Sequence, residues 1–143
     1  KLEASGLASH ISALQKPVLG ICVGMQLLTR HSEEGDRDLL GIFPLDTLHF
    51  RDRITLKVPH MGWNKVELDK NSPLFSNLDK DAYFYYVHSY FIPYHPELTV
   101  AYSEYGLRFS AAFAWRNFYG VQFHPEKSGW AGEQILANFA QLF

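Results

Sequence analysis

The sequence has 143 residues, which is about the length of one globular domain. Hydrophobic residues make up 47% and charged residues 20%, an ordinary globular composition that argues against disorder. The 13 basic and 15 acidic residues leave a formal net charge of −2 without a block of Lys or Arg, so nucleic-acid binding is not expected. The single cysteine, Cys22, excludes an internal disulfide and a Cys-rich zinc site, and no apolar run reaches the roughly 18 residues of a membrane span. We therefore expect a cytoplasmic protein without metal, cofactor or membrane partner.

The first third of the chain alternates between helical and strand patterns. Apolar residues at helical spacing predict a helix from Leu2 to Leu14, which Pro17 ends because the residue before a proline avoids the α region. An apolar strand over Val18–Cys22 and a helix over Met25–Leu28 follow, and the polar stretch Ser32–Gly41 is expected to be a loop. Short apolar strands joined directly to helices are typical of a parallel sheet covered on both faces.

The remainder of the chain predicts mostly short strands. They are expected at 47–50, 54–58, 66–68, 83–87, 99–102, 107–115 and 120–123, with a Ser72-capped helical turn and a hairpin turn at 116–117. A last helix opens at Ser128 or Gly129 and is expected to place Ile135, Leu136, Phe139 and Leu142 on one face. The sequence therefore predicts an α/β fold: a three-layer α/β/α arrangement with a mixed, largely parallel central sheet and an inserted antiparallel region.

Cys22 stands in the sequence Gly-Ile-Cys-Val-Gly, between a predicted strand and a predicted helix. This is the setting of the nucleophile elbow G-x-S-x-G, with cysteine in place of serine. A helix N-terminus favours the thiolate, and the N–H of Val23 would be placed to donate to an oxyanion. The alternative is that Cys22 is a buried, inert thiol on an apolar strand.

Two identical His-Pro-Glu triplets compete for the role of base and orienting carboxylate. His124 and Glu126 follow the apolar strand 120–123, where a parallel sheet presents its functional ends. His95 and Glu97 precede a strand and are interpreted as a surface turn. We therefore expect His124 to lie within hydrogen-bond reach of both Cys22 and Glu126.

Together, segments 17–26 and 120–126 resemble class I, triad-type glutamine amidotransferases. Segments 32–35, 58–64, 86–90 and 124–128 are similar to those of the glutamine amidotransferase subunits of imidazole glycerol phosphate synthases. Related anthranilate, GMP and CTP synthase domains share the cysteine and the His-Pro-Glu, but are not expected to carry Pro-His-Met-Gly-Trp-Asn or Ser-Glu-Glu-Gly. The resemblance implies one class I amidotransferase domain over residues 1–143, lacking the family's first strands and the loop that completes the oxyanion hole.

The resemblance also implies a reaction. A triad of Cys22, His124 and Glu126 would hydrolyse L-glutamine to glutamate and ammonia. The residues implied in glutamine binding are Gly24, Gln26, Glu34, Ser89 and Tyr90, with Val23 in the oxyanion hole. The ammonia would pass to a (β/α)8 cyclase subunit in a heterodimer, which makes imidazole glycerol phosphate and AICAR in histidine biosynthesis.

A partner surface is expected around an aromatic-rich set that flanks these motifs: Met61, Trp63, Tyr85, Tyr86 and Tyr90. Tyr83 and Phe84 are expected in the core instead, and His88 is interpreted as a structural histidine near the site. By the resemblance, the residues that face the cyclase are Trp63, Asn64, Tyr85 and Lys127. The alternative functions are another class I amidotransferase, a stand-alone γ-glutamyl hydrolase, and a catalytically silent interaction module.

Overall fold

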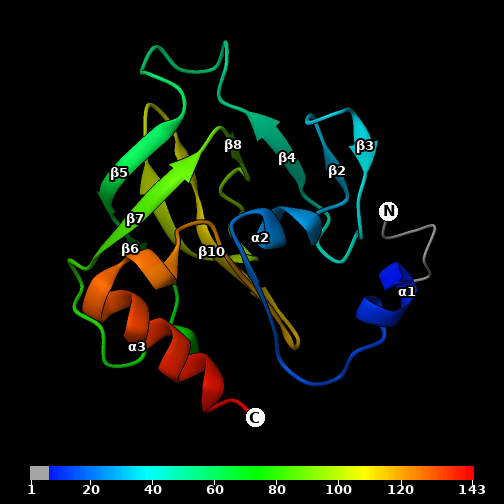
Figure 1. Ribbon diagram of the computed structural model, residues 1–143, viewed down its shortest axis with the longest axis vertical. Helices are drawn as coiled ribbons and strands as arrows, with labels where there is room; N and C mark the ends of the chain where they lie inside the picture. Colours follow the sequence, from blue (N-terminus) through cyan, green and yellow to red (C-terminus); the bar gives the residue numbers. More distant parts are fainter. Residues whose placement is uncertain (1–6) are drawn as a thin grey trace.

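The computed structural model describes residues 7–143, with an α/β arrangement in which strands greatly outnumber helices (Figure 1). The first helix, α1, spans Leu7–Ser12, and the part of the predicted helix that begins at Leu2 lies outside the described residues. None of the described helices is long and apolar enough to cross a membrane.

The main sheet has five strands, and their order across the sheet is β1 (Val18–Ile21), β11 (Phe118–Val121), β10 (Arg108–Trp115), β9 (Thr99–Glu104) and β6 (Glu67–Leu68). β1 and β11 pair in parallel, with Ile21 opposite Val121. The other pairs of this sheet, in the part of the chain that the structure describes, are antiparallel. The sheet is mixed, as predicted, but its parallel part is smaller than expected. The reason is local: tight turns at Gly106 (φ 75°) and Arg116 (φ 56°) connect β9, β10 and β11, and such turns join antiparallel strands only.

Helices cover the two faces of this sheet, which gives the predicted three layers. Neighbouring residues of β11 point to opposite faces. Val121 packs in the core cluster that contains Ile135 of α3 (Gly129–Ala140). On the other face, a Cβ at Gly120 would lie 2.7 Å from Met25 of α2 (Val23–Leu27) and 2.4 Å from the ring of Phe113. Only glycine allows α2 to approach β11 so closely.

The region inserted between these elements is only partly antiparallel, as against the prediction: among the described residues, strands 31–32 and 46–49 pair in parallel, and its other strand pairs are antiparallel. A small sheet contains β3 (Arg37–Asp38), β2 (His31–Ser32), β4 (Asp46–His49) and β8 (Tyr90–Phe91) in that order. A separate two-stranded ribbon is formed by β5 (His60–Lys65) and β7 (Tyr83–His88), and we call it the β5/β7 ribbon. In Figure 1 the ribbon lies on the left above α3, the small sheet lies at the upper right, and α2 lies between them.

Two short 3₁₀ turns complete the chain. The first, η1 (Pro73–Phe75), is capped by the Ser72 hydroxyl, which accepts from the N–H of Leu74 as predicted. The second, η2 (Pro125–Lys127), carries Glu126 and follows β11 directly.

Several sequence-based boundaries are wrong. Residues 54–58 form bends and irregular backbone rather than a strand, and the strand of this region is β5, which the sequence pattern does not predict. The stretch expected to be a loop contains the short β2/β3 pair. On α3, Leu136 is exposed and Asn138 is buried, because the Asn138 amide donates to the backbone oxygens of Leu74 and Ser76 at 2.8 Å.

Candidate active site

Cys22 occupies a sharp strand-to-helix turn between β1 and α2. Its backbone has φ 53° and ψ −105°, a conformation that non-glycine residues rarely adopt. Its N–H donates to the Val121 carbonyl at 2.8 Å and so continues the β1/β11 pairing. A Cβ at Gly20 would lie 2.5 Å from the Gly24 carbonyl oxygen, so glycine at position 20 is required for the turn. The Gly-Ile-Cys-Val-Gly segment therefore has the elbow geometry that its sequence predicts.

The thiol of Cys22 is buried, with 8% of the residue exposed, and it accepts a hydrogen bond from Gln122 Nε2 at 3.6 Å. Burial raises the pKa of the thiol, and the Glu126 carboxylate adds to that increase. The Val23 backbone N–H and the Gln122 amide act in the opposite direction but do not outweigh burial. The expected stabilisation of the thiolate by the helix N-terminus is therefore too small here, and the thiol needs a base to ionise it.

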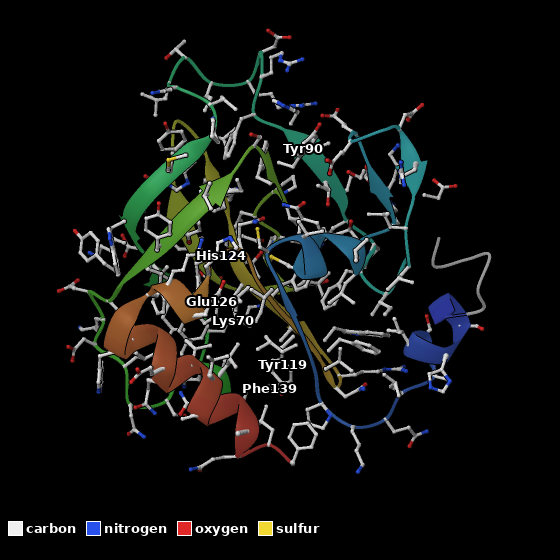
Figure 2. All side chains as sticks on the ribbon, in the orientation of Figure 1. Lys70, Tyr90, Tyr119, His124, Glu126 and Phe139 are labelled. Atoms are coloured by element: carbon white, nitrogen blue, oxygen red, sulfur yellow. The ribbon has the colours of Figure 1, made fainter. Side chains whose placement is uncertain are left out.

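His124 and Glu126 form the imidazole–carboxylate pair that the second triplet predicts (Figure 2). His124 Nδ1 lies 2.8 Å from Glu126 Oε2. An ionised carboxylate only accepts hydrogen bonds, so Nδ1 carries the proton and Nε2 is left free to act as a base. Burial raises the pKa of Glu126, but its backbone N–H, the His124 ring and Lys127 lower it by more, and the net shift is downward. The carboxylate is therefore ionised at neutral pH.

The nucleophile and the imidazole follow neighbouring parallel strands. Because Ile21 pairs with Val121, Cys22 and His124 both lie just beyond the carboxyl ends of β1 and β11. Among the described residues no hydrogen bond joins Cys22 Sγ to the His124 ring; the side-chain donor to the thiol is Gln122, and the Val23 backbone N–H also interacts with it. Hydrogen bonds between nucleophile and base are often long in unliganded enzymes and tighten when substrate binds.

The backbone of His124 is fixed to the β5/β7 ribbon. Its N–H donates to the Tyr85 carbonyl at 2.9 Å, and its carbonyl accepts from the Ser128 hydroxyl at 2.6 Å. The same hydroxyl oxygen accepts from the Tyr85 N–H at 2.9 Å. Both backbone groups of Tyr85 therefore hold the segment that carries the imidazole.

The first triplet has a different environment. The ring nitrogen Nδ1 of His95 accepts from the backbone N–H groups of Glu97 and Leu98 at 3.2 and 3.3 Å. The backbone N–H of His95 donates to Thr99 Oγ1. This histidine organises a turn before β9, in agreement with its interpretation as a turn residue.

The residues expected to bind glutamine have different surroundings. Gln26 is buried, and its Nε2 donates to the Tyr90 carbonyl and to Gln122 Oε1, each at 3.1 Å. Gly24 of α2 has open space where a Cβ would project, and Ser89 and Tyr90 directly follow β7. Glu34 is exposed, and its N–H donates to the Ser32 hydroxyl.

An open hollow of about 470 Å³ adjoins Tyr90, and the residues that line it are Glu33, His49, Arg51, Asp52, Arg53 and Tyr90. The Arg53 guanidinium binds both carboxylate oxygens of Glu33, at 2.8 and 3.0 Å. This guanidinium, together with the His49 N–H, lowers the pKa of Glu33 to about 2. Neither Glu33 nor Arg53 is predicted from the sequence, although the Ser-Glu-Glu-Gly segment points to the neighbouring Glu34.

The outward face of the β5/β7 ribbon carries large exposed side chains. Met61 and Trp63 are 62% and 56% exposed, and Trp63 meets the half-buried Tyr85 edge-on at 5.9 Å. Tyr83 is also exposed and Tyr86 is fully buried, so both are the reverse of what the sequence predicts. The cause is strand alternation, because odd-numbered positions of the ribbon face outward and even-numbered positions face the core.

The other two residues of the expected partner surface differ in their exposure. Asn64 is half-buried and donates to the Glu104 carbonyl at 2.9 Å. Lys127 is exposed at the end of η2, one residue from Glu126.

The elbow cysteine, the His-Glu pair and the fold define a glutamine amidotransferase: residues 3–142 match the glutamine amidotransferase class-I family, and the chain belongs to that family. The sequence is 51% identical over 142 residues to "Imidazole glycerol phosphate synthase subunit HisH" of Bacteroides fragilis, covering 99% of this chain and 71% of that protein. It is also 51% identical to proteins of the same name from Pasteurella multocida, over 136 residues, and Escherichia coli K12, over 133 residues. These matches cover 95% and 92% of this chain, and 68% and 67% of those proteins.

Solved structures share the fold. A putative GMP synthase subunit from Thermoplasma acidophilum superposes with a TM-score of 0.71 at 24% identity, over 96% of this chain and 62% of that one. A glutamine amidotransferase from Thermotoga maritima superposes with a TM-score of 0.65 at 19% identity, over 98% of this chain and 54% of that one. The chain thus spans less than two thirds of either solved chain, and at these identities the likeness concerns the fold alone.

Proposed function

We propose that this chain is the glutaminase part of an imidazole glycerol phosphate synthase and supplies ammonia for histidine biosynthesis. The observation that carries the proposal is the elbow cysteine beside a His-Glu pair at the ends of two neighbouring parallel strands. The choice of this synthase among class I amidotransferases is supported by the 51% identity to three proteins of that name.

In the first half of the reaction, Cys22 Sγ attacks the side-chain carbonyl carbon of L-glutamine. His124 Nε2 takes the thiol proton as the carbon–sulfur bond forms, and Glu126 stabilises the resulting imidazolium through Nδ1. The Val23 N–H, which already interacts with the thiol, donates to the negative oxygen of the tetrahedral intermediate. The carbon–nitrogen bond then breaks, the imidazolium proton passes to the leaving ammonia, and a γ-glutamyl thioester remains on Cys22.

In the second half, water replaces ammonia. His124 Nε2 accepts a proton from the attacking water, the carbon–sulfur bond breaks, and the proton returns to the sulfur. Glutamate leaves and the enzyme is restored. Because the pKa of the Cys22 thiol is raised, the base is needed in the first step and the thiol is a weak nucleophile without it.

The amino-acid end of glutamine is proposed to lie between α2 and the segment that follows β7. Gly24, Gln26, Glu34, Ser89 and Tyr90 supply this site. A carboxylate such as Glu34 suits the α-ammonium group of the substrate, and backbone N–H groups suit its α-carboxylate. The hollow at Tyr90 is open to solvent and adjoins this region.

A cyclase subunit with a (β/α)8 fold is the proposed partner, in a heterodimer. Ammonia in water is mostly protonated and then cannot act as a nucleophile, so a sealed path between the two proteins is needed. The outward face of the β5/β7 ribbon supplies an aromatic patch of the kind that protein interfaces bury, with Trp63 and Tyr85 at its centre. Asn64 and Lys127 border that patch, and Lys127 can pair with an acidic residue of the partner.

The test is glutamate production by the purified protein, with and without the cyclase, for the wild type and for Cys22→Ala. We expect hydrolysis that the cyclase stimulates, and a loss of about four orders of magnitude or more in Cys22→Ala, with an unchanged circular dichroism spectrum. A diazoketone analogue of glutamine should label Cys22. A rate of hydrolysis that is the same with and without the cyclase would favour a stand-alone hydrolase. A Cys22 that does not react with the analogue would favour a silent interaction module.

A further inference from the structure

A continuous chain of hydrogen bonds runs from the β5/β7 ribbon to the Cys22 thiol. It starts at Asn64 Nδ2, which lies 3.3 Å from His60 Nε2. His60 Nδ1 lies 2.9 Å from His88 Nε2, and His88 Nδ1 lies 2.8 Å from the Tyr90 carbonyl oxygen. His60 and His88 face each other in the ladder of the ribbon, and both are buried.

The second half of the chain consists of two buried amides. Gln26 Nε2 donates both to the Tyr90 carbonyl and to Gln122 Oε1, each at 3.1 Å. Gln122 Nε2 donates to Cys22 Sγ at 3.6 Å. Gln122 is completely buried, and it directly precedes Phe123 and His124. The described residues contain no buried side-chain nitrogen or oxygen that lacks a hydrogen-bond partner.

The acceptors fix the direction of every bond. A backbone carbonyl can only accept, so His88 Nδ1 carries a proton. Burial lowers the pKa of His88 to about 3 and that of His60 to about 4, so both rings are neutral. His88 Nε2 is then an acceptor, which requires the proton of His60 on Nδ1 and leaves His60 Nε2 to accept from Asn64.

The same logic orients the two amides. Gln26 Nε2 must face the Tyr90 carbonyl, because that oxygen can only accept. The same nitrogen therefore also donates to Gln122. Gln122 must therefore turn its oxygen toward Gln26 and its nitrogen toward the thiol. Reversing either amide would place donor against donor or acceptor against acceptor in a buried site, where an unsatisfied polar group is destabilising.

We propose that His60 and His88 are positioning residues for the nucleophile: through the Tyr90 carbonyl and the Gln26–Gln122 pair, they hold the Gln122 amide with its N–H on Cys22. They touch no reacting atom themselves. A donor aimed at the sulfur stabilises the thiolate, so the chain connects the partner-facing ribbon to the reactivity of Cys22. This inference deepens the proposed function and rests on it for the identity of the reaction.

The experiment measures the rate at which iodoacetamide alkylates Cys22 as a function of pH, and it needs no glutamine. Cys22 is the only cysteine of the sequence, so mass spectrometry of its peptide reports one site. The apolar variant His88→Leu should lower the rate at pH 8 about threefold to tenfold and move the pH profile upward, because an aligned donor to the thiolate is lost. Gln122→Met removes that donor directly, and its effect should be at least as large. Besides the Gln122 amide, the Val23 backbone N–H and the carboxylate of Glu126 act on the charge of the thiol, and both are unchanged in the two variants.

Two further variants separate positioning from packing. His88→Asn places an amide donor where Nδ1 stood, and it should restore the rate to within about twofold of the wild type. Tyr86→Phe is the matched control, because Tyr86 lies on the same strand, is fully buried, and loses one hydrogen bond, to Ser103, outside the chain. It should leave the rate unchanged. Equal effects of His88→Leu and Tyr86→Phe would overturn the proposal.

A measurement on the wild type covers the case in which His88→Leu does not fold. Imidazole ¹⁵N chemical shifts should show both His60 and His88 protonated on Nδ1 alone. A proton on Nε2 of His88 would break the chain at Tyr90 and would also overturn the proposal. If the wild type instead fails to hydrolyse glutamine, the proposed function falls while the alkylation results still decide the positioning role.

Discussion

Replacing Gly132 with alanine tests how α3 is held against the segment that carries the imidazole–carboxylate pair. Gly132 lies in the first turns of α3 and is buried. A Cβ built on it would lie 1.9 Å from the Pro125 carbonyl oxygen and 2.9 Å from the Cβ of Ser128. Gly132 is therefore a point of close approach between α3 and η2, and the η2 residue that it meets directly precedes Glu126.

Two opposing effects set the size of the change. Alanine in a helix interior is favoured over glycine by about 1 kcal/mol. Overpacking a well-packed site costs about 1–3 kcal/mol, and the obstructing atom here belongs to the backbone and cannot rotate away. The upper end of that cost applies, about 3 kcal/mol, and the helix gain of about 1 kcal/mol offsets part of it, so we expect Gly132→Ala to lower the free energy of unfolding by a net value of about 2 kcal/mol. Movement of Pro125 would also displace Glu126 from His124, so kcat for glutamine should fall.

Equilibrium unfolding in urea measures this change. With a slope of about 2 kcal/mol per molar urea, the unfolding midpoint should fall by about 1 M. Gly24→Ala is the matched control for stability, because Gly24 is also a helical glycine and a Cβ there would have no neighbour within 4 Å. It should be neutral or stabilising by up to about 1 kcal/mol. A Gly132→Ala variant as stable as Gly24→Ala would refute the close approach of α3 and η2.

Three further predictions concern the site and its surroundings. His124→Ala should reduce glutamine hydrolysis nearly as much as loss of the nucleophile, whereas His95→Ala should leave kcat unchanged; reversed effects would show that the wrong triplet was chosen. Trp63→Ala should weaken the stimulation of hydrolysis by the cyclase while changing the urea midpoint little, and Trp130→Ala, an equally exposed tryptophan on α3, should change neither quantity. Ser128→Ala removes the acceptor of the Tyr85 N–H and leaves the His124 carbonyl with the Lys127 N–H as its remaining donor, so calorimetry should show a loss of about 1–3 kcal/mol, and full stability would contradict the role of the Ser128 hydroxyl.

The elbow and the second triplet could be predicted because their constraints are local. The apolar run 18–21 and the Gly-Ile-Cys-Val-Gly pattern lie within a few consecutive residues, and that pattern is enough to predict the sharp turn at Cys22. The order of β1 beside β11 is not local, yet the shared chemistry of Cys22 and His124 implied that their strands end close together.

The β5/β7 ribbon was harder to predict. Gly62 interrupts the apolar alternation of β5, and its φ of 124° is one that only glycine adopts readily, so the segment does not read as a strand. Tyr83 was therefore wrongly expected in the core and Tyr86 on the surface. Tertiary packing decides which face of a strand meets the core, and the aromatic character of a side chain does not.

The polar chain to the thiol could not be predicted from the sequence at all. Four of its links join residues that lie 28, 64, 96 and 100 positions apart along the chain, and none of these four pairs forms a recognisable motif. His88 was expected to be structural, but the residue that faces it, His60, carried no signal beyond its place in the Pro-His-Met-Gly-Trp-Asn segment.

The paired histidines of the ribbon also make the fold sensitive to acid. Each ring uses both nitrogens in hydrogen bonds, so a proton added to either one would set two N–H donors against each other or against the Asn64 amide. Burial lowers the pKa of His60 to about 4 and that of His88 to about 3, while in the unfolded chain both titrate near 6.5. Below pH 6.5 the His60 and His88 rings therefore become protonated in the unfolded chain while they stay neutral in the folded chain. Between about pH 5.5 and 4.5 this pair alone removes roughly 2 kcal/mol of stability for each pH unit, and the loss becomes smaller nearer pH 4, where the folded His60 also takes up a proton. The free energy of unfolding should therefore fall on acidification before the carboxylates are all protonated.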